Sequence, residues 1–383
     1  MIRAVFLSHT AAPSGAELAT LRLLTALRDG GTVHASMLLT ADGPLVDLLR
    51  ARDIPVTLCH NDFDSRSLTV TGSGPGRLIT GAAELARLGA RLGETVRAER
   101  AHVVVAQSTK ALLMGAVAAR RAGVPLVWQV HDRVSGEYFG GALAFALRML
   151  GWTAARGIIA NSRSTLRTLH TRGRPVAIAY PGVEDGAVVE RVPQREPARV
   201  RIAMVGRITR WKGQDVLLRA LALLRYRPAE VHVVGGTFFD EQDYRAELER
   251  TAAELGLPVE FTGHLDDPAP VFAQADIAVH CSVLAEPFGQ VVVEAMRAGC
   301  AIVAADAGGP TEIVRPEVDG LLTPPGDPVA LAAALDRLIA DPALRRRLGT
   351  AARERSAEFG IAATARAVTG LVQQVTGRRM VPV

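Results

Sequence analysis

Short apolar runs alternate with amphipathic segments along most of the chain. In the first half, residues 2–7 and 33–39 have the composition of buried strands, whereas residues 16–27 and 45–50 have the apolar spacing of helices. Further strand-like runs occur at residues 103–105, 126–130 and 177–179. Strands that alternate with helices predict a mostly parallel sheet with helices on both faces.

A polar stretch at residues 191–199, RVPQREPAR, separates this pattern from a second copy of it. The stretch contains two prolines, four charges and no apolar face, which is typical of a linker between domains. After it, strand-like and helix-like runs alternate again, at residues 202–205, 215–224, 231–234, 243–255, 259–261, 270–275 and 277–283. An amphipathic helix is predicted at residues 361–375. The pattern therefore predicts two α/β domains.

Length and charge agree with this division. The chain has 383 residues, and one domain usually has about 100–200. The formal charge of +5 comes without clusters of basic and aromatic side chains, so we expect no nucleic-acid partner. A peripheral contact with a membrane surface stays open.

Cysteine usage and hydropathy indicate the compartment. Cys59, Cys281 and Cys300 are widely spaced in apolar surroundings, which predicts buried thiols in a reducing environment. No apolar run reaches the roughly 20 residues that span a bilayer, and the longest candidate, residues 142–150, contains Arg148. The first residues lack the pattern of a signal peptide. We therefore expect a cytoplasmic protein.

Two carboxylates lie eight residues apart in EPFGQVVVEAMRAG, residues 286–299, directly after the apolar run at 277–283. Pro287 and Gly289 prevent a helix from starting before about Gly289, and a glycine such as that at position 299 is favoured just beyond a helix end. Glu286 is therefore expected in a loop and Glu294 inside the following helix. The amino end of such a helix offers free N–H groups and a positive dipole, which suit a phosphate or a polar ligand.

A second candidate site follows the linker, in VRIAMVGRITRWKGQD at residues 200–215. The predicted strand ends at Val205 and is followed by Gly206 and Arg207, and Lys212 precedes the next helix. Two cations five residues apart around a turn can bind a diphosphate from two directions, the arginine by its fork and the lysine as a point charge. Lysine occurs only at positions 110 and 212, which adds weight to Lys212. Trp211 has no explanation from the sequence.

The stretch at 286–299 resembles the E-x7-E signature of retaining glycosyltransferases of family 4, also described as glycosyl transferases group 1. That family has the two-domain GT-B fold. The resemblance implies that Glu286 and the loop after it hold the hydroxyls of the donor sugar, and that Glu294 binds the ribose of the nucleotide. The implied donor-binding residues of the loop are Phe288, Gly289 and Gln290.

The resemblance extends to two further stretches. The family has an arginine and a lysine at the spacing of Arg207 and Lys212, beside a glycine at the position of Gly206, where the pair stabilises the leaving diphosphate. Residues 308–312, GGPTE, resemble the family's Gly-Gly-x-x-Glu loop near the donor, which implicates Gly309 and a helix that begins near Thr311.

The resemblance also bears on the donor. The Pro-Phe-Gly after Glu286 resembles members that use UDP-glucose or UDP-N-acetylglucosamine, so a UDP-sugar is favoured over a GDP-sugar. We predict no cofactor and no metal ligand.

In the first half, polar residues follow the predicted strands, and ligands of parallel sheets gather at the carboxyl ends of strands. Gly15 begins a helix and lets a substrate approach the backbone closely. The family usually has Gly-Gly where Ser14 and Gly15 stand. An N-cap role for Ser14 beside Glu17 explains the sequence about equally well.

His131 ends the apolar run at 126–130, so its side chain is expected to point into the cleft between the domains. The resemblance also places a cleft histidine here, which hydrogen-bonds the donor sugar or holds the acceptor. Asp132, next to it, and Lys110, after the run at 103–105, are the candidate acceptor contacts.

Residues 61–77, NDFDSRSLTVTGSGPGR, are polar and glycine-rich and have no period, so a long loop is expected. Asp62 and Asp64 match the D-x-D metal motif of another glycosyltransferase fold. That motif ends a buried strand, whereas this pair begins a loop, so we interpret both as surface residues. Acceptor specificity is expected in this loop and in the turn at residues 107–110.

The predicted fold is thus α/β of the GT-B type, with two Rossmann-like parallel-sheet domains that face a cleft. We predict an acceptor-binding domain at residues 1–190, a linker at 191–199 and a nucleotide-sugar-binding domain at 200–360. Residues 361–383 are predicted to form a C-terminal helix that crosses back to the first domain.

The predicted activity is retaining, metal-independent transfer of a hexose or N-acetylhexosamine from a nucleoside diphosphate sugar to an acceptor hydroxyl by front-face attack. Arg207, Lys212, His131 and Glu286 are the catalytic candidates. The acceptor, whether a small molecule, a saccharide or a lipid-linked sugar, is left open, as is the oligomeric state.

Other functions fit the same residues. They are a sugar phosphorylase or nucleotide-sugar epimerase on the same fold, and a catalytically silent subunit that binds sugar nucleotides. A dehydrogenase is not supported, because no G-x-G-x-x-G follows the first strand.

Overall fold

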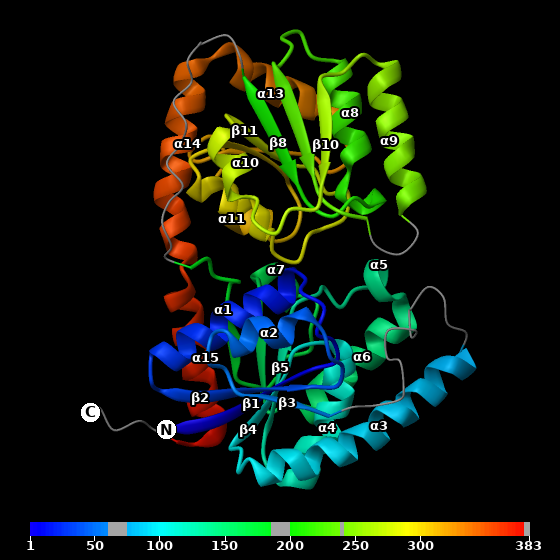
Figure 1. Ribbon diagram of the computed structural model, residues 1–383, viewed down its shortest axis with the longest axis vertical. Helices are drawn as coiled ribbons and strands as arrows, with labels where there is room; N and C mark the ends of the chain where they lie inside the picture. Colours follow the sequence, from blue (N-terminus) through cyan, green and yellow to red (C-terminus); the bar gives the residue numbers. More distant parts are fainter. Residues whose placement is uncertain (60–74, 185–199, 238–240, 379–383) are drawn as a thin grey trace. The chain divides into compact units, whose positions relative to one another are not determined.

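The computed structural model describes residues 1–59, 75–184, 200–237 and 241–378 (Figure 1). The chain divides into two units, one made of Met1–Glu184 with Gly360–Val383 and the other of Asp185–Phe359. The predicted linker at 191–199 lies outside the described residues, as do Asp62 and Asp64.

The first unit is built on a seven-stranded sheet whose neighbouring strands are all parallel. The strand order is β3-β2-β1-β4-β5-β6-β7. The strands are β1 (Ile2–Ser8), β2 (Val33–Leu39), β3 (Val56–Leu58), β4 (Val103–Ala106), β5 (Leu126–Val130), β6 (Gly157–Ala160) and β7 (Val176–Ile178). Parallel strands need crossover connections, which the helices between them supply.

The helices of the first unit are α1 (Gly15–Asp29), α2 (Pro44–Arg50), α3 (Pro75–Ala98), α4 (Thr109–Ala122), α5 (Gly136–Phe139), α6 (Gly141–Ala154), α7 (Arg163–Leu166) and α15 (Ile361–Thr376). Helix α3 begins at Pro75, so the loop predicted at 61–77 was wrong for residues 75–77. Proline suits a first helical position, because its φ is preset and its missing N–H has no intrahelical partner there. The sequence predicts a loop at Pro75 because this residue stands in a glycine-rich run.

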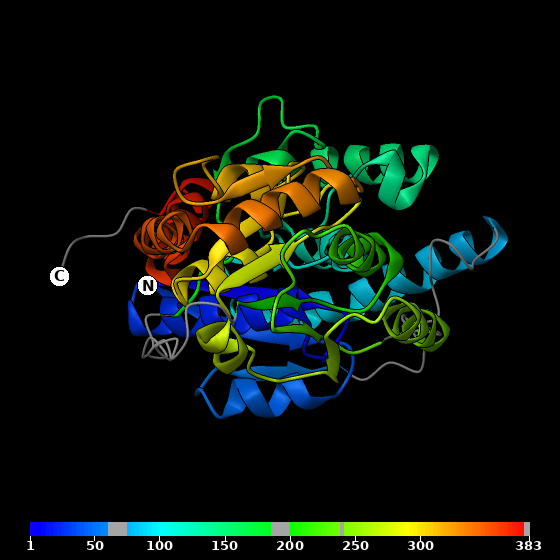
Figure 2. The ribbon, with the colours of Figure 1, turned by 90° about the horizontal axis from the view of Figure 1, so that it is seen from above.

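Alternate residues of the strands face opposite cores, as the period of a strand requires. Phe6 and Met37 lie in a core with α1, α2 and α15, whereas Leu7 and Trp128 lie in a core with α3, α4 and α6. Helix α15 packs against α1, and the two helices lie side by side in both views (Figures 1 and 2). The last helix of the chain therefore completes the core of the first unit.

The second unit has a six-stranded parallel sheet in the order β10-β9-β8-β11-β12-β13. Its strands are β8 (Arg201–Val205), β9 (Glu230–Val234), β10 (Val259–Gly263), β11 (Ile277–His280), β12 (Ala301–Ala305) and β13 (Leu321–Thr323). The strand predicted at 277–283 ends earlier, at His280. The chain leaves the sheet there because the N–H of Val283 donates to the carbonyl of Trp211 at 2.8 Å.

The helices of the second unit are the 3-10 turn η2 (Arg210–Lys212), α8 (Gln214–Ala222), α9 (Gln242–Glu254), α10 (Ala269–Gln274), α11 (Gln290–Arg297), α12 (Pro310–Ile313), α13 (Pro328–Ala340), α14 (Pro342–Ser356) and the 3-10 turn η3 (Ala357–Phe359). Helix α8 packs against α9 and α13, and α11 packs against α14 (Figure 1).

In each sheet the chain reverses its direction of winding once. Strand β1 neighbours β4 in the first unit, and β8 neighbours β11 in the second, where Ala203 pairs with Ala278. In open parallel sheets, ligands bind outside the carboxyl ends of the two strands at such a switch point. The topology therefore directs attention to the loops after β1 and β4 and to those after β8 and β11.

Candidate active site

At the switch point of the second unit, Lys212 and Glu286 form a close ion pair. The ammonium nitrogen of Lys212 donates to both carboxylate oxygens of Glu286, at 2.7 and 2.6 Å. Both side chains are 12% exposed. Lys212 ends η2 in the connection after β8, and Glu286 lies in the loop after β11, so the pair joins the two loops that flank the switch point.

Two further side chains hold the Glu286 carboxylate. The hydroxyl of Ser282 donates to Oε2 at 2.9 Å, and Nε2 of His280 lies 3.2 Å from the same oxygen. Burial of the carboxyl opposes its ionisation, but the charge of Lys212 and the hydrogen bond from His280 outweigh burial and hold the pKa of Glu286 well below its usual range. Glu286 is therefore a permanent anion that is held by three neighbours.

Sequence reasoning missed His280 and Ser282. His280 is the last residue of β11, at the carboxyl edge of the sheet. The rule that singled out His131, a histidine at the carboxyl end of an apolar strand, applies equally to His280. It was overlooked because the predicted strand extended past it to residue 283.

The structure explains Trp211. The ammonium of Lys212 lies over the indole ring, 4.4 Å from the ring centroid. An indole face attracts a cation, with a free energy of about 0.5–2 kcal/mol that rises as the site is desolvated. The indole and the Glu286 carboxylate together fix where the Lys212 charge lies.

Gly206 and Gly309 lie in the loops at this edge of the sheet. A Cβ on Gly206 would lie 3.8 Å from two carbons of the Lys212 side chain, so the backbone lies directly beside that side chain. A Cβ on Gly309 would lie 2.1 Å from the carbonyl oxygen of Phe288. Only glycine fits at position 309, and the loops after β11 and β12 consequently pack backbone against backbone.

Helix α11 opens onto the same loops. Its N-cap, Gly289, has φ +98° and no side chain, so no side chain caps the first N–H groups of this eight-residue helix. Phe288 is 3% exposed, and its ring packs against Phe359 at 6.0 Å between centroids. Only the backbone of Phe288 can therefore meet a ligand. Within α11, Gln290 donates to Glu294 at 2.8 Å, one helical turn apart.

The helix predicted near Thr311 is a single turn, α12. Its first residue, Pro310, has no N–H to offer, and the hydroxyl of Thr311 donates to the carbonyl of Gly308 at 2.8 Å. The helix ends at Ile313, because Val314 has extended backbone with φ -93° and ψ 126°. This turn is consequently too short to provide the helix amino terminus that the sequence led us to expect.

Arg207 follows β8, and its side chain lies near the carboxylate of Glu241. Its Nε is 3.8 Å from Oε2 of Glu241, and its carbonyl accepts from the side chain of Gln214 at 2.9 Å. The side chain of Arg207 is 38% exposed. Both cations predicted to bind the diphosphate thus lie opposite a glutamate.

In the first unit, His131 belongs to a polar network at the carboxyl edge of the sheet. Its Nε2 lies 3.1 Å from Oε1 of Gln107, which also accepts from Thr20 at 2.9 Å, while Gln107 donates to Gln129 at 3.1 Å. Because Oε1 of Gln107 is an acceptor, His131 carries its proton on Nε2. Nδ1 is then available as an acceptor. Burial lowers the pKa of His131 to about 4, so the ring is neutral at pH 7.

The remaining candidates of the first unit lie at the amino ends of helices or in a loop. Gly15 is the first residue of α1, and a Cβ there would meet no atom within 4 Å. Ser14 is the N-cap, but its hydroxyl donates to the Glu17 carboxylate and not to the helix backbone. Lys110 is half-buried in the first turn of α4, and Asp132 is exposed.

The structure thus brings the predicted residues together in two groups. In the second unit, the loops after β8, β11 and β12 and the helix α11 carry the first group, which comprises Gly206, Arg207, Lys212, Glu286, Phe288, Gly289, Gln290, Glu294 and Gly309. In the first unit, the loops after β1, β4 and β5 carry Gly15, Lys110, His131 and Asp132. Within the described ranges, no three His, Cys, Asp or Glu side chains gather as a metal site would require.

Two Rossmann-like units, each with a parallel sheet and with polar residues at its carboxyl edge, define the GT-B class of glycosyltransferases. Residues 13–186 match the family model for Glycosyltransferase Family 4, and residues 190–355 match the model for glycosyl transferases group 1. A D-inositol 3-phosphate glycosyltransferase from a Nocardioides species is 31% identical over 377 residues, which cover 87% of this chain and 82% of that protein. The chain belongs to this family of GT-B glycosyltransferases.

Solved structures support the same assignment. The crystal structure of HepE from Anabaena in complex with UDP and glucose has a TM-score of 0.81 and 28% identity, and covers 98% of this chain and 100% of that one. Sucrose-phosphate synthase from Thermosynechococcus elongatus has a TM-score of 0.79 at 20% identity, which shows the fold alone. In the described part of the chain, no helix has the length and apolar character needed to cross a bilayer.

Proposed function

We propose that this glycosyltransferase moves a hexose or N-acetylhexosamine from a UDP-sugar to an acceptor hydroxyl, with retention of configuration and without a metal ion. The observation that carries the proposal is the Lys212 ammonium, which Glu286 and Trp211 hold at the β8–β11 switch point. A fixed cation beside a glycine loop is the device that stabilises a leaving diphosphate. HepE, which shares 28% identity with this chain, was crystallised with UDP and glucose.

In this mechanism, the bond between C1 of the sugar and the diphosphate oxygen breaks, and the electron pair leaves with the diphosphate. The acceptor hydroxyl attacks C1 from the same face, and its proton passes to the departing phosphate oxygen. Lysine has three N–H donors, of which Glu286 accepts two, so Lys212 retains one for the phosphate. Arg207 supplies the second cation. For this, the diphosphate must replace Glu241 as the partner of the Arg207 guanidinium.

The hydrogen bonds of Glu286 indicate which role its carboxylate has in this mechanism. Its carboxylate already accepts from Lys212, Ser282 and His280, which fills most of its acceptor positions. Its main task is therefore to orient Lys212, and a sugar hydroxyl must displace a present donor or use the backbone of the loop. The amino end of α11 offers that backbone at Gly289 and Gln290.

In the first unit, His131 acts as a neutral hydrogen-bond partner. Its free Nδ1 accepts from a hydroxyl of the donor sugar or of the acceptor. With a pKa of about 4, the ring is a weak base, which suits a positioning role better than general-base catalysis.

Calorimetric titration of the purified protein with UDP, GDP and ADP tests the donor half of the proposal. We expect UDP to bind in preference to the other two, and Glu294→Gln to weaken UDP binding because Glu294 would hold the ribose. Glu247→Gln, an exposed glutamate on α9, is the matched control. Equal binding of all three nucleotides, or UDP binding that is unchanged in Glu294→Gln, would contradict the donor assignment.

Transfer itself is tested with UDP-glucose and UDP-N-acetylglucosamine against a panel of hydroxyl acceptors. D-inositol 3-phosphate comes first in the panel, because the name of the Nocardioides relative gives it. Proton NMR of the product reports whether the anomeric configuration of the donor is kept, and assay in a chelator reports metal dependence. An inverted product or a loss of activity in the chelator would overturn the corresponding part of the mechanism.

A further inference from the structure

Helix α6 has the composition of a buried helix, but most of its residues are exposed or half-buried in the part of the chain that the structure describes. Its sequence, GALAFALRMLGWTA, contains one charged residue, Arg148, and no acidic one. A helix that is apolar on all sides is normally enclosed by protein or membrane. Yet only Ala144 and Gly151 are buried, and Phe145 is 56% exposed.

The two buried residues identify the inner face of α6. A Cβ on Gly151 would lie 2.3 Å from the ring of Trp128, so the helix packs tightly against β5 there. On the outer face, Ala142, Phe145 and Ala146 are exposed and Met149 is half-buried. These positions follow the three- and four-residue spacing of one helical stripe. The stripe is therefore a continuous apolar surface.

Between Glu137 of α5, which packs against α6, and Glu184, every charged side chain is basic. Residues 138–183 contain six arginines and no Asp or Glu, although the formal charge of the whole chain is only +5. Such a run gives the outer part of the first unit a positive potential, which attracts anionic surfaces and is screened by salt.

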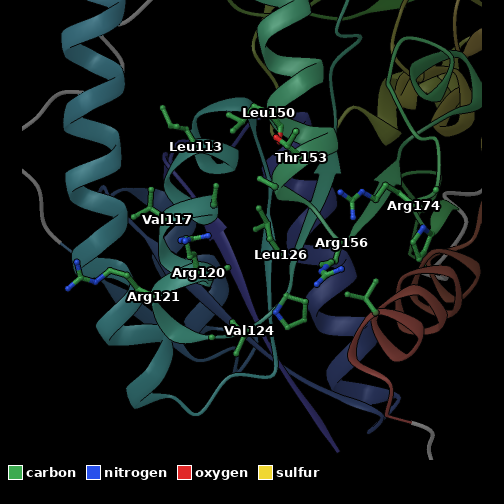
Figure 3. Close-up of a pocket in the computed structure, with 18 of the residues that line it drawn as sticks. Leu113, Val117, Arg120, Arg121, Val124, Leu126, Leu150, Thr153, Arg156 and Arg174 are labelled. Carbon is green, nitrogen blue, oxygen red and sulfur yellow. The ribbon is translucent and has the colours of Figure 1, made fainter.

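An open cavity of about 1330 Å³ lies at the carboxyl end of α6, at the amino-terminal edge of the sheet. Figure 3 shows Arg120 and Arg121 on one side of it and Arg156 and Arg174 on the other, with Leu126 between them. The arginines come from the last turn of α4 and from the residues before β6 and β7. Ligand pockets for small molecules usually measure about 300–1,000 Å³, so this cavity suits a larger or extended partner.

The helix and the cavity form one surface. Leu150 of α6 lines the cavity, and the indole of Trp152 donates to the carbonyl of Arg172 at 3.0 Å. In return, Nε of Arg174 donates to the carbonyl of Trp152 at 3.0 Å. These two bonds fix the arginines before β7 against the end of the apolar helix.

We propose that this surface, which we call the α6 surface (Phe145, Met149, Leu150, Arg120, Arg156 and Arg174), binds an anionic phospholipid membrane. The apolar stripe would enter the boundary between headgroups and acyl chains, as the apolar face of an interfacial helix does. The guanidinium groups around the cavity would bind lipid phosphates, for which their forked geometry is suited. The proposal does not depend on the transfer reaction, because the cavity lies at the opposite edge of the sheet from His131.

Sedimentation with lipid vesicles tests the proposal. We expect the full chain to bind vesicles of phosphatidylcholine mixed with phosphatidylglycerol but not vesicles of phosphatidylcholine alone, and to be released by salt. Arg120→Gln with Arg156→Gln should lower the partition coefficient about fivefold for each arginine removed. Phe145→Ser should lower it about tenfold, because an apolar ring leaves the membrane boundary.

Matched variants in the second unit control for general changes in charge and hydrophobicity. Leu223, which is 54% exposed, is the counterpart of Phe145, and the exposed Arg225 and Arg250 are counterparts of the two arginines. We expect Leu223→Ser and the pair Arg225→Gln with Arg250→Gln to bind vesicles like the unaltered chain. Circular dichroism of each variant establishes that it is folded before vesicle binding is compared.

Three results would overturn the proposal. The first is failure to bind phosphatidylglycerol vesicles at low salt. The second is unchanged vesicle binding in Phe145→Ser together with release by duplex DNA, which would show a general polyanion surface. The third is a dimer that Phe145→Ser converts to a monomer in the absence of lipid, since a second copy of the chain would then cover α6.

Discussion

Lys212 and Glu286 join two loops that lie 74 residues apart in the sequence, with the ammonium nitrogen 2.7 and 2.6 Å from the two carboxylate oxygens. Neither residue is more than 12% exposed, so each depends on the other for compensation of its charge. In the proposed mechanism the pair serves both stability and catalysis, and the two effects must be separated by experiment.

Lys212→Met should lower kcat about 100-fold, because one group that stabilises the leaving diphosphate is lost. It should also destabilise the protein by about 3–5 kcal/mol, because Glu286 is left as a buried charge without its partner. In the double variant Lys212→Met with Glu286→Gln, we expect unfolding in urea to return close to that of the unaltered protein, whereas kcat stays low. Recovery of kcat together with stability would show that Lys212 is only structural.

Glu241→Gln should strengthen the binding of UDP, because Arg207 no longer has a carboxylate 3.8 Å from its Nε. Exposed ion pairs are worth at most about 1 kcal/mol, so the gain in affinity should not exceed about fivefold. Calorimetric titration measures it. Glu247→Gln removes the same charge from the pair with Arg210 and serves as the control. A weaker affinity in Glu241→Gln would mean that Glu241 itself contributes to the nucleotide site.

Trp211→Leu should lower kcat about fivefold and leave the affinity for UDP nearly unchanged, because the proposed mechanism gives the indole the task of positioning the Lys212 ammonium and no contact with the nucleotide. Trp211→Phe keeps an aromatic face and should restore most of the rate. Steady-state kinetics of the two variants give kcat and KM separately. An equal loss in both variants would argue that the bulk of the indole matters and its interaction with Lys212 does not.

The sequence sufficed to predict the positions that follow the strands. The apolar periods located β8 and β11 to within one residue at their amino ends, and ligands of parallel sheets gather at the carboxyl edge, so the loops that carry Lys212 and Glu286 could be predicted. Within those loops, the two residues were singled out by their charge and by the resemblance to family 4 glycosyltransferases. The apolar pattern could not predict that Lys212 and Glu286 form an ion pair with each other. The bond between Lys212 and Glu286 depends on the order of strands in the sheet, which the sequence pattern does not contain.

The errors have similar physical causes. The end of β11 at His280 is set by a hydrogen bond from Val283 to a distant loop, and local propensity continues the strand past that point. The side chain of Phe288 was expected among the donor-binding residues, but its burial against Phe359 depends on η3, more than 60 residues away along the chain. The end of β11 and the burial of Phe288 thus depend on contacts between distant segments, which the periodicity of the sequence does not predict.

The Nε2 hydrogen bond of His131 to Gln107 and the burial of its ring predict a specific response to pH. The pKa of His131 lies at about 4 in the folded protein, below the value of about 6.5 for an unfolded chain. A lowered histidine pKa stabilises the folded state above about pH 6.5, and this contribution falls as the pH drops toward 4. Between pH 6.5 and pH 4, the free energy of unfolding of the unaltered chain should therefore fall more than that of His131→Gln. We expect the difference to be on the order of 2 kcal/mol.

Nitrogen NMR of the imidazole measures both the tautomer and the titration directly. We expect Nε2 to carry the proton at pH 7 and the ring to become charged only near pH 4. Urea unfolding of the unaltered chain and of His131→Gln, at a series of pH values from 7 to 4, measures the linked stability. A midpoint near 6.5, or unfolding curves of the two proteins that stay parallel across this range, would show that the ring is solvated, and the positioning role of its Nδ1 would lose its basis.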